Sequence, residues 1–238
     1  MDNKKKFWIG GYHAVLKAIQ NKERKILNLI VNSEEKKKEL NFENSTLKNN
    51  KFFNKIFDNT NFSHQGYAAE IESLNDHNID FKSRNSKVEN YIALDGVTDP
   101  RNIGSIIRCC VAFNFFHLIV NKKDFNEKSF AMYKAASGAM EKINLYQVSN
   151  IAHCVDFFKE KDFQIIGFDG HSDKDFYLHS WNKKNIIIFG SEGKGIKKLI
   201  KNNCDEILKI NINSYIDSLN VANAAAAVLM KLKYTFKN

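Results

Sequence analysis

Residues 91–112 read YIALDGVTDPRNIGSIIRCCVA, and this stretch decides the fold class. Its first five residues form a short apolar run of the length and composition typical of a buried β-strand. The only proline of the chain, Pro100, follows a short turn and is favourable at the start of a helix. The apolar residues after it recur at helical spacing, at Ile103, Ile106, Ile107, Cys110 and Val111. The stretch therefore predicts a strand, a turn and an amphipathic helix.

The same pattern continues towards the C-terminus. Residues 117–120, 164–168 and 185–190 are short apolar runs bounded by turn residues, with helix-like stretches between them. Strands that alternate with helices predict an α/β fold with a mostly parallel sheet. Ligands of such sheets bind at the carboxyl ends of the strands. Functional residues are therefore expected directly after each strand.

The N-terminal part of the chain predicts a smaller α/β unit. We expect a helix at 12–20, a strand at 26–31, helical pieces with an apolar side within 34–57 and a strand at 66–74. Residues 75–89 are polar and show no periodicity, which is typical of a linker. The predicted domains are thus 1–74 and 90–238, joined by a linker at 75–89.

Composition narrows the class of protein without deciding it. The chain has 238 residues, 43% of them hydrophobic, and a formal net charge of +9 that is spread over both halves. Such a charge favours polyanionic partners, and it is equally typical of an ordinary lysine-rich surface. The four cysteines show no C-x-x-C pair and no zinc spacing, so we expect a reducing compartment and no metal. No signal peptide or long apolar run is evident, which predicts a cytoplasmic protein without a membrane span.

Three segments at predicted strand exits carry the candidate functional residues. The first contains Asn102, Gly104 and Arg108, the second is GSEGKG at 190–195, and the third joins Ile210 to SLNV at 218–221. Each has an ordinary structural explanation: Asn102 or Ser218 caps a helix, Arg108 is a surface arginine, and the glycines form a turn. The glycine-rich loop matches neither the P-loop nor the dinucleotide-binding pattern.

In combination, the three segments resemble the SpoU (TrmH-like) branch of the SPOUT methyltransferases. The family pattern N-x-G-x-x-x-R is matched by Asn102, Gly104 and Arg108, and G-x-E-G-x-G is matched within 190–195. The third pattern, I-P-M followed by S-L-N-V, is matched by Ile210 and residues 218–221. The stretch KAASGA at 134–139 with Glu141 is similar to the segment that the family has between its first two motifs.

The N-terminal part adds to the resemblance, and a few positions depart from it. IGGYHAV at 9–15 and HQG at 64–66 resemble the substrate-binding domain of the subgroup that acts on the peptidyl-transferase region of 23S rRNA. Positions at which this chain differs from the common family residue are Asn211, Ile212, Ser214 and Ala222. These positions shape the backbone, so they bear on the geometry of the cofactor loop.

The resemblance implies a fold and a cofactor. It implies a C-terminal trefoil-knotted domain (SPOUT), a feature rare in other folds, and a small N-terminal α/β domain of the L30e-like type. The knot is expected to hold S-adenosyl-L-methionine in a bent form, largely through backbone groups at Gly190, Ile210 and Leu219. Backbone N–H and C=O groups are suited to reading the edges of an adenine.

The resemblance also implies a reaction, transfer of a methyl group to a ribose 2′-hydroxyl. Arg108 is expected to stabilise the developing alkoxide and a neighbouring phosphate, because a guanidinium is too weak an acid to act as a free base. The other expected catalytic residues, which would orient Arg108 and the ribose, are Asn102, Glu192, Ser218 and Asn220. No metal is implied.

The implied partners are structured RNA and a second copy of the chain. In such a homodimer each site borrows residues from its partner. The small domain is expected to bind RNA with the lysines at 4–6, Arg24 and Lys25.

The HQG segment and the N-terminal domain favour a guanosine of 23S rRNA as the substrate. A transfer-RNA guanosine and a catalytically silent RNA-binding protein remain as alternatives. A Rossmann oxidoreductase is disfavoured, because the chain lacks its glycine pattern.

Overall fold

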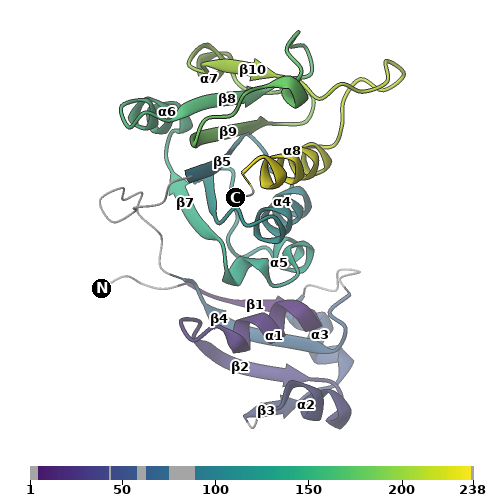
Figure 1. Cartoon of the computed structure of the whole chain (residues 1–238). Coiled ribbons are helices and arrows are strands. Elements are labelled where there is room, and N and C mark those ends of the chain that lie inside the picture. The colour runs from purple at the N-terminus through teal and green to yellow at the C-terminus, as the bar shows by residue number, and fades with distance from the viewer. Residues whose placement is uncertain (1–4, 43, 58–62, 75–88, 237–238) are drawn as a thin grey trace. The chain divides into compact units, whose positions relative to one another are not determined.

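The computed structural model describes residues 5–42, 44–57, 63–74 and 89–236. The chain divides into two compact units (Figure 1). The first consists of Met1–Asn75 together with Asn126–Lys142, and the second of Asp76–Phe125 together with Ile143–Asn238. The predicted linker falls almost wholly on residues outside the described part, so the division into 1–74 and 90–238 stays a prediction. Glu89, its last residue, already belongs to a strand.

The first unit is built on a four-stranded sheet. Strand β4 pairs antiparallel with both β1 and β2, and β3 adds to β2 in parallel. The strands of this sheet are β1 (Lys6–Gly10), β2 (Ile26–Val31), β3 (Ser45–Leu47) and β4 (Tyr67–Glu72). The helical elements are α1 (Tyr12–Gln20), α2 (Glu34–Leu40), α3 (Asn50–Ile56), α5 (Phe130–Ala136) and the 3-10 turn η1 (Ala139–Glu141).

The main elements predicted for this unit are confirmed. Helix 12–20 and strand 26–31 have the predicted bounds, and the strand predicted at 66–74 spans 67–72. The region 34–57 does contain two helices, and Phe53 and Phe57 supply its buried side. Strands β1 and β3 were not predicted. Strand β1 directly follows a lysine run, and β3 has only three residues, so neither shows enough alternation to be recognised.

A buried ion pair joins the two parts of the sequence that make up this unit. The guanidinium of Arg24 donates from Nε to Oε2 and from Nη2 to Oε1 of Glu141, both at 3.0 Å. The amide of Asn21 donates to the same carboxylate at 2.8 Å, and Nη1 of Arg24 donates to the carbonyl oxygen of Glu72 at 2.7 Å. The side chains of Arg24 and Glu141 are only 1% and 4% exposed. The prediction that Arg24 binds RNA is therefore wrong, because its charge is enclosed and fully paired.

The second unit is an α/β domain with a six-stranded sheet. All five neighbouring strand pairs are parallel, in the order β10-β8-β9-β5-β6-β7. The strands are β5 (Glu89–Asp95), β6 (His117–Asn121), β7 (Asn144–Val148), β8 (Gln164–Phe168), β9 (Lys184–Gly190) and β10 (Glu206–Leu208). The helical elements are α4 (Pro100–Ala112), α6 (Ile151–Lys159), η2 (Phe176–Leu178), α7 (Lys198–Asn202) and α8 (Val221–Thr235).

Helices cover both faces of this sheet. Helices α6 and α7 pack on the face that presents Tyr91, Ile165 and Ile186, which belong to one buried cluster. Helices α4 and α8 lie side by side, and α8 packs against β9 (Figure 1). Side chains of a strand alternate between faces, so strands covered on both sides must be apolar throughout. The predicted α/β fold with a parallel sheet is confirmed, whereas the trefoil knot stays a prediction.

The order of the strands determines which of the candidate functional segments lie next to each other. From β5 the chain runs to β6 and β7 on one side, and then to β8, β9 and β10 on the other. Strands β5 and β9 are therefore neighbours, with Asp95 beside Gly190 in register. The crevice at such a reversal of strand order is where open parallel sheets bind ligands.

Removal of Glu141 tests the importance of the buried pair. We expect Glu141→Ala to lower the free energy of unfolding by about 3–5 kcal/mol, because Arg24 would keep a buried charge without its partner. The matched control is Lys25→Ala, which breaks the exposed pair with Glu72 and should cost below about 1 kcal/mol. Urea unfolding measures both. Equal losses in the two variants would contradict a structural role of the Arg24–Glu141 pair.

Candidate active site

Asn102 lies in the first turn of helix α4, directly beyond the end of β5. The helix is capped by Asp99, whose carboxylate accepts a hydrogen bond from the backbone N–H of Arg101 at 2.8 Å, and Pro100 starts its first turn. The alternative that Asn102 merely caps this helix is therefore wrong. Its amide is available for other contacts.

Glu192 lies in a short loop that closes on itself after strand β9. The backbone N–H of Gly195 donates to the carbonyl of Ser191 at 2.9 Å, and that of Ser191 donates to the carbonyl of Gly195 at 3.1 Å. Gly193 and Gly195 both have positive φ, of 83° and 64°. At Gly190 an added Cβ would lie 2.1 Å from the carbonyl carbon of Gly195. The glycines of this loop are thus required by its own folding.

The side chain of Asn220 makes two separate sets of hydrogen bonds. Its Oδ1 accepts from the backbone N–H groups of Ala222 at 2.9 Å and Asn223 at 3.4 Å, so it is the N-cap of helix α8. Its Nδ2 donates to Oδ1 of Asn102 at 3.0 Å and to Oε1 of Glu192 at 2.6 Å. The interpretation of Ser218 as the cap is wrong, because Asn220 occupies that position.

A third hydrogen bond closes the cluster, from Nδ2 of Asn102 to Oε1 of Glu192 at 2.9 Å. We call Asn102, Glu192 and Asn220 the polar triad. Its members come from the three segments singled out in the sequence and meet at the carboxyl ends of the strands. One carboxylate oxygen accepts from two amides, so the three side chains fix one another in position.

The structure does not bring Arg108 or Ser218 into this cluster. Arg108 is exposed and lies six residues after Asn102 on helix α4, so at about 100° per residue the two side chains point in different directions. Burial raises the pKa of the neighbouring Cys109 thiol, and the charge of Arg108 opposes that shift. Ser218 is exposed in the loop before α8 and takes no part in the three hydrogen bonds of the triad.

The predicted cofactor positions lie around the same edge of the sheet. Gly190 ends β9 and Ile210 follows β10; both are half-buried, and Leu219 is exposed. All residues from 211 to 220 are exposed, so the backbone of this loop is accessible. Asn211, at the position where proline is usual, donates from its amide to Oδ2 of Asp175 at 2.6 Å. This contact ties the loop to the turn η2.

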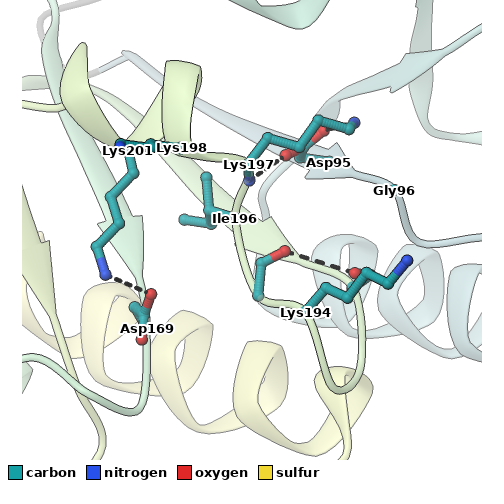
Figure 2. Close-up of a pocket in the computed structure, with 10 residues that line it drawn as sticks. Asp95, Gly96, Asp169, Lys194, Ile196, Lys197, Lys198 and Lys201 are labelled. Carbon is teal, nitrogen blue, oxygen red and sulfur yellow. Dashed lines mark hydrogen bonds and ion pairs between the residues drawn. The ribbon is translucent and has the colours of Figure 1, made fainter.

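A cavity of about 470 Å³ opens beside the loop that carries Glu192 (Figure 2). None of the predicted site residues lines it, although Ser191 and Gly195 do. The other residues that line it are Asp95, Gly96, Asp169, Lys194, Ile196, Lys197, Lys198 and Lys201. Asp95 and Asp169 were not among the predicted site residues. The signal for both was their position, since Asp95 ends one apolar strand and Asp169 directly follows another.

Two ion pairs frame the cavity (Figure 2). The carboxylate of Asp95, only 1% exposed, accepts from the backbone N–H of Lys197 at 2.8 Å and from its ammonium group. Asp169 accepts from Nζ of Lys201 at 2.7 Å and from the backbone N–H of His171 at 2.9 Å. Burial acts to raise the pKa of Asp169, but these two hydrogen bonds outweigh it and the pKa is lowered. The carboxylate therefore stays ionised at neutral pH.

Two other features are absent from the part of the chain that the structure describes. No cluster of three or more His, Cys, Asp or Glu side chains there is arranged to hold a metal ion. No helix within the described ranges is both long and apolar enough to cross a membrane.

Comparison with known proteins identifies the family. The model of the SpoU rRNA methylase family matches residues 89–230, more than half of the chain. The 23S rRNA (guanosine-2′-O-)-methyltransferase RlmB of Photobacterium profundum is 31% identical over 172 residues, which cover 71% of this chain and 70% of that protein.

Two solved structures show the extent of the similarity in fold. The SpoU methyltransferase AviRb from Streptomyces viridochromogenes, in complex with the cofactor AdoMet, aligns with a TM-score of 0.81 at 20% identity, over 97% of this chain and 90% of that one. The TrmH/SpoU tRNA modifying enzyme of A. aeolicus aligns with a TM-score of 0.57 at 21% identity, over 63% of this chain and 75% of that one.

The fold is α/β with a parallel sheet, and the polar triad lies at the carboxyl edge of that sheet. The chain belongs to the SpoU rRNA methylase family. The predicted class, an RNA methyltransferase that uses S-adenosyl-L-methionine, is thereby confirmed.

The variant Asn220→Asp separates the two functions of Asn220. An aspartate still caps helix α8, but it cannot donate to Glu192 and places a second carboxylate beside it. We expect a loss of about 1–2 kcal/mol of stability at pH 7, where both carboxylates are charged. The close pair raises a folded-state carboxyl pKa, so this destabilisation should fade as the pH falls towards 4.

Urea unfolding of Asn220→Asp at pH 7 and pH 4.5 measures this effect, with Asn220→Ser as a cap that brings no charge. A loss in Asn220→Asp that is the same at both pH values would contradict the contact with Glu192.

Proposed function

We propose that this protein transfers the methyl group of S-adenosyl-L-methionine to the ribose 2′-hydroxyl of a guanosine in 23S rRNA. The observation that carries the proposal is the polar triad, formed by residues of all three family motifs and placed where the strand order reverses. RlmB, the relative from Photobacterium profundum, is named for this reaction. The proposed substrate would place the enzyme in the cytoplasm.

The residues at the strand ends fit the cofactor. The exposed backbone of 211–220 offers N–H and C=O groups for the edges of an adenine, and Ile212 and Leu219 offer exposed apolar surface for its ring. We propose Gly190, Ile210 and Leu219 as cofactor contacts. When bound, S-adenosyl-L-methionine supplies an electrophilic methyl group on a positively charged sulfur.

Arg108 is proposed as the residue that stabilises the attacking oxygen. A ribose hydroxyl develops negative charge as it attacks, and a fixed guanidinium lowers the energy of that charge. The same guanidinium would bind the adjoining phosphate, for which its planar array of donors is well suited. Asn102, Glu192 and Asn220 are proposed to hold the site in shape, and Ser218 to contact the ribose. Alignment of the hydroxyl then supplies a further part of the rate.

A homodimer would bring Arg108 and the polar triad together in one site, which a single chain does not do. On helix α4 the side chain of Arg108 projects in a different direction from that of Asn102, so we propose that each site takes its arginine from the partner. Apolar side chains that are unusually exposed are available for such an interface, on the loop before α8 and on α8 itself. They are Tyr215, Ile216, Met230 and Tyr234.

The extent of the structural similarity supports rRNA over tRNA as the substrate. The rRNA methyltransferase from Sinorhizobium meliloti aligns over 100% of this chain, including the first unit, whereas the tRNA modifying enzyme aligns over 63%. The exposed Lys5 and Lys25 on the first unit would add to RNA binding through phosphate contacts. A tRNA guanosine remains the second candidate.

The deciding experiment is a map of ribose methylation in 23S rRNA from cells with and without the gene, complemented by variants. We expect one 2′-O-methylguanosine to disappear, to return with the wild type and with Arg101→Ala, and to stay absent with Arg108→Ala. Arg101 is the control because it is an exposed arginine on the same helix. Loss of a tRNA methyl group instead would transfer the proposal to tRNA, and an unchanged methylation pattern would refute it.

Mixing two inactive variants tests the shared site. If Arg108 acts on the partner's triad, a heterodimer of Arg108→Ala and Asn220→Ala holds one intact site out of two. Random exchange makes about half of the dimers heterodimers, so about one quarter of wild-type activity should return. Methyl transfer from labelled cofactor measures this after the two variants are refolded together. No recovery, with heterodimers present, would contradict a shared site.

A further inference from the structure

We propose that the lysine-lined cavity beside Glu192 binds a backbone phosphate of the RNA strand that carries the target ribose. The inference deepens the proposed function, on which it rests, by adding a binding site outside the family motif residues that are expected to do chemistry. It starts from the cavity of about 470 Å³ and from the four lysines among the residues that line it: Lys194, Lys197, Lys198 and Lys201.

The charges of these lysines are not equally available. Lys197 is paired with the buried Asp95, and Lys201 is paired with Asp169, whose lowered pKa keeps it ionised. Lys194 and Lys198 are exposed and have no ion-pair partner among the described residues. Four lysines against two aspartates leave the cavity with a net positive charge. The two paired lysines are held in place, and the two unpaired lysines attract an anion.

The loop from Ser191 to Gly195 sets the position of the anion relative to the triad. Glu192 points to Asn102 and Asn220, and Lys194 lines the cavity on the other side of the same loop. Their Cα atoms are two residues apart and thus within about 7.6 Å of each other. The two mutual backbone hydrogen bonds between Ser191 and Gly195 make the loop rigid. A ribose beside Glu192 and a phosphate beside Lys194 therefore fit one short stretch of RNA.

A phosphate suits this cavity better than other anions do. Lysine binds phosphate as a compact point charge, without the planar geometry that arginine offers to carboxylates. Gly96 and Ser191 also line the cavity, so one stretch of its wall is backbone without a side chain and another presents a hydroxyl. A hydroxyl can donate a hydrogen bond to a phosphate oxygen. The three proposed cofactor contacts, Gly190, Ile210 and Leu219, do not line the cavity.

The test measures RNA binding directly, so that it does not depend on turnover. The variant is Lys194→Ala/Lys198→Ala, and the ligand is a 23S rRNA fragment that contains the peptidyl-transferase region. We expect affinity to fall about tenfold near 0.15 M salt, and the slope of log affinity against log salt to become shallower by about one to two. Affinity for S-adenosyl-L-methionine, measured by calorimetry, should change less than about twofold.

The matched control is Lys161→Ala/Lys183→Ala. These two exposed lysines precede strands β8 and β9, at the edge of the sheet opposite the cavity, and their removal costs the same net charge. A second variant, Lys194→Arg/Lys198→Arg, keeps the charge and should keep both the affinity and the salt slope. Urea unfolding checks that all variants are folded.

The measured affinities for RNA and for S-adenosyl-L-methionine decide between the proposal and its alternatives. Unchanged RNA affinity and salt slope in Lys194→Ala/Lys198→Ala would overturn the proposal, as would an equal loss in the control. Loss of cofactor affinity with intact RNA binding would assign the cavity to the cofactor instead. If the wild type binds the fragment in this way but methylates no rRNA, the proposed function fails while the phosphate site stands.

Discussion

The parallel pairing of β5 with β9 is the constraint on which the site depends. It sets Asp95 beside Gly190, so the two loops that leave these strands start at adjacent points of the sheet. Gly190 lets the returning backbone of Gly195 and Ile196 pass within contact of its Cα, and any side chain there would collide with it. Asp95 then holds that returning segment from the other strand, through the backbone N–H of Lys197. The loop that carries Glu192 is thereby fixed at both ends.

The polar triad is a consequence of that anchored loop. Asn102 reaches it from the first turn of α4, and Asn220 reaches it from the N-terminus of α8; these two helices pack on each other. Asn102 is half-buried and Glu192 and Asn220 are exposed, so each hydrogen bond contributes on the order of 1 kcal/mol or less. The main effect of these bonds is geometric, because a carboxylate bound by two amides has one orientation. Asn220 also ends the exposed loop by starting a helix.

The elements and residues that depend on local sequence patterns were predicted correctly. Those that depend on contacts between distant parts of the chain were not predicted. Apolar runs predicted β5, β6, β8 and β9, and the resemblance to the family motifs predicted all three triad residues. The short strands β3 and β10, of three residues each, exist because a neighbouring strand offers hydrogen-bonding groups, which no local pattern reveals. Arg24 was misassigned to RNA binding because the partner that buries it, Glu141, is 117 residues away.

Arg24 and Lys194 show how two basic side chains of one chain acquire opposite uses. Arg24 is buried and donates from all three of its guanidinium nitrogens to Glu141 and Glu72, so its charge joins two distant segments of the first unit. Lys194 lies between two glycines of positive φ on a loop whose backbone is already satisfied by itself. Nothing in that loop needs the ammonium group for folding. The ammonium group of Lys194 lies on a rigid loop beside the polar triad. Because the fold does not use its charge, that charge is available to a ligand.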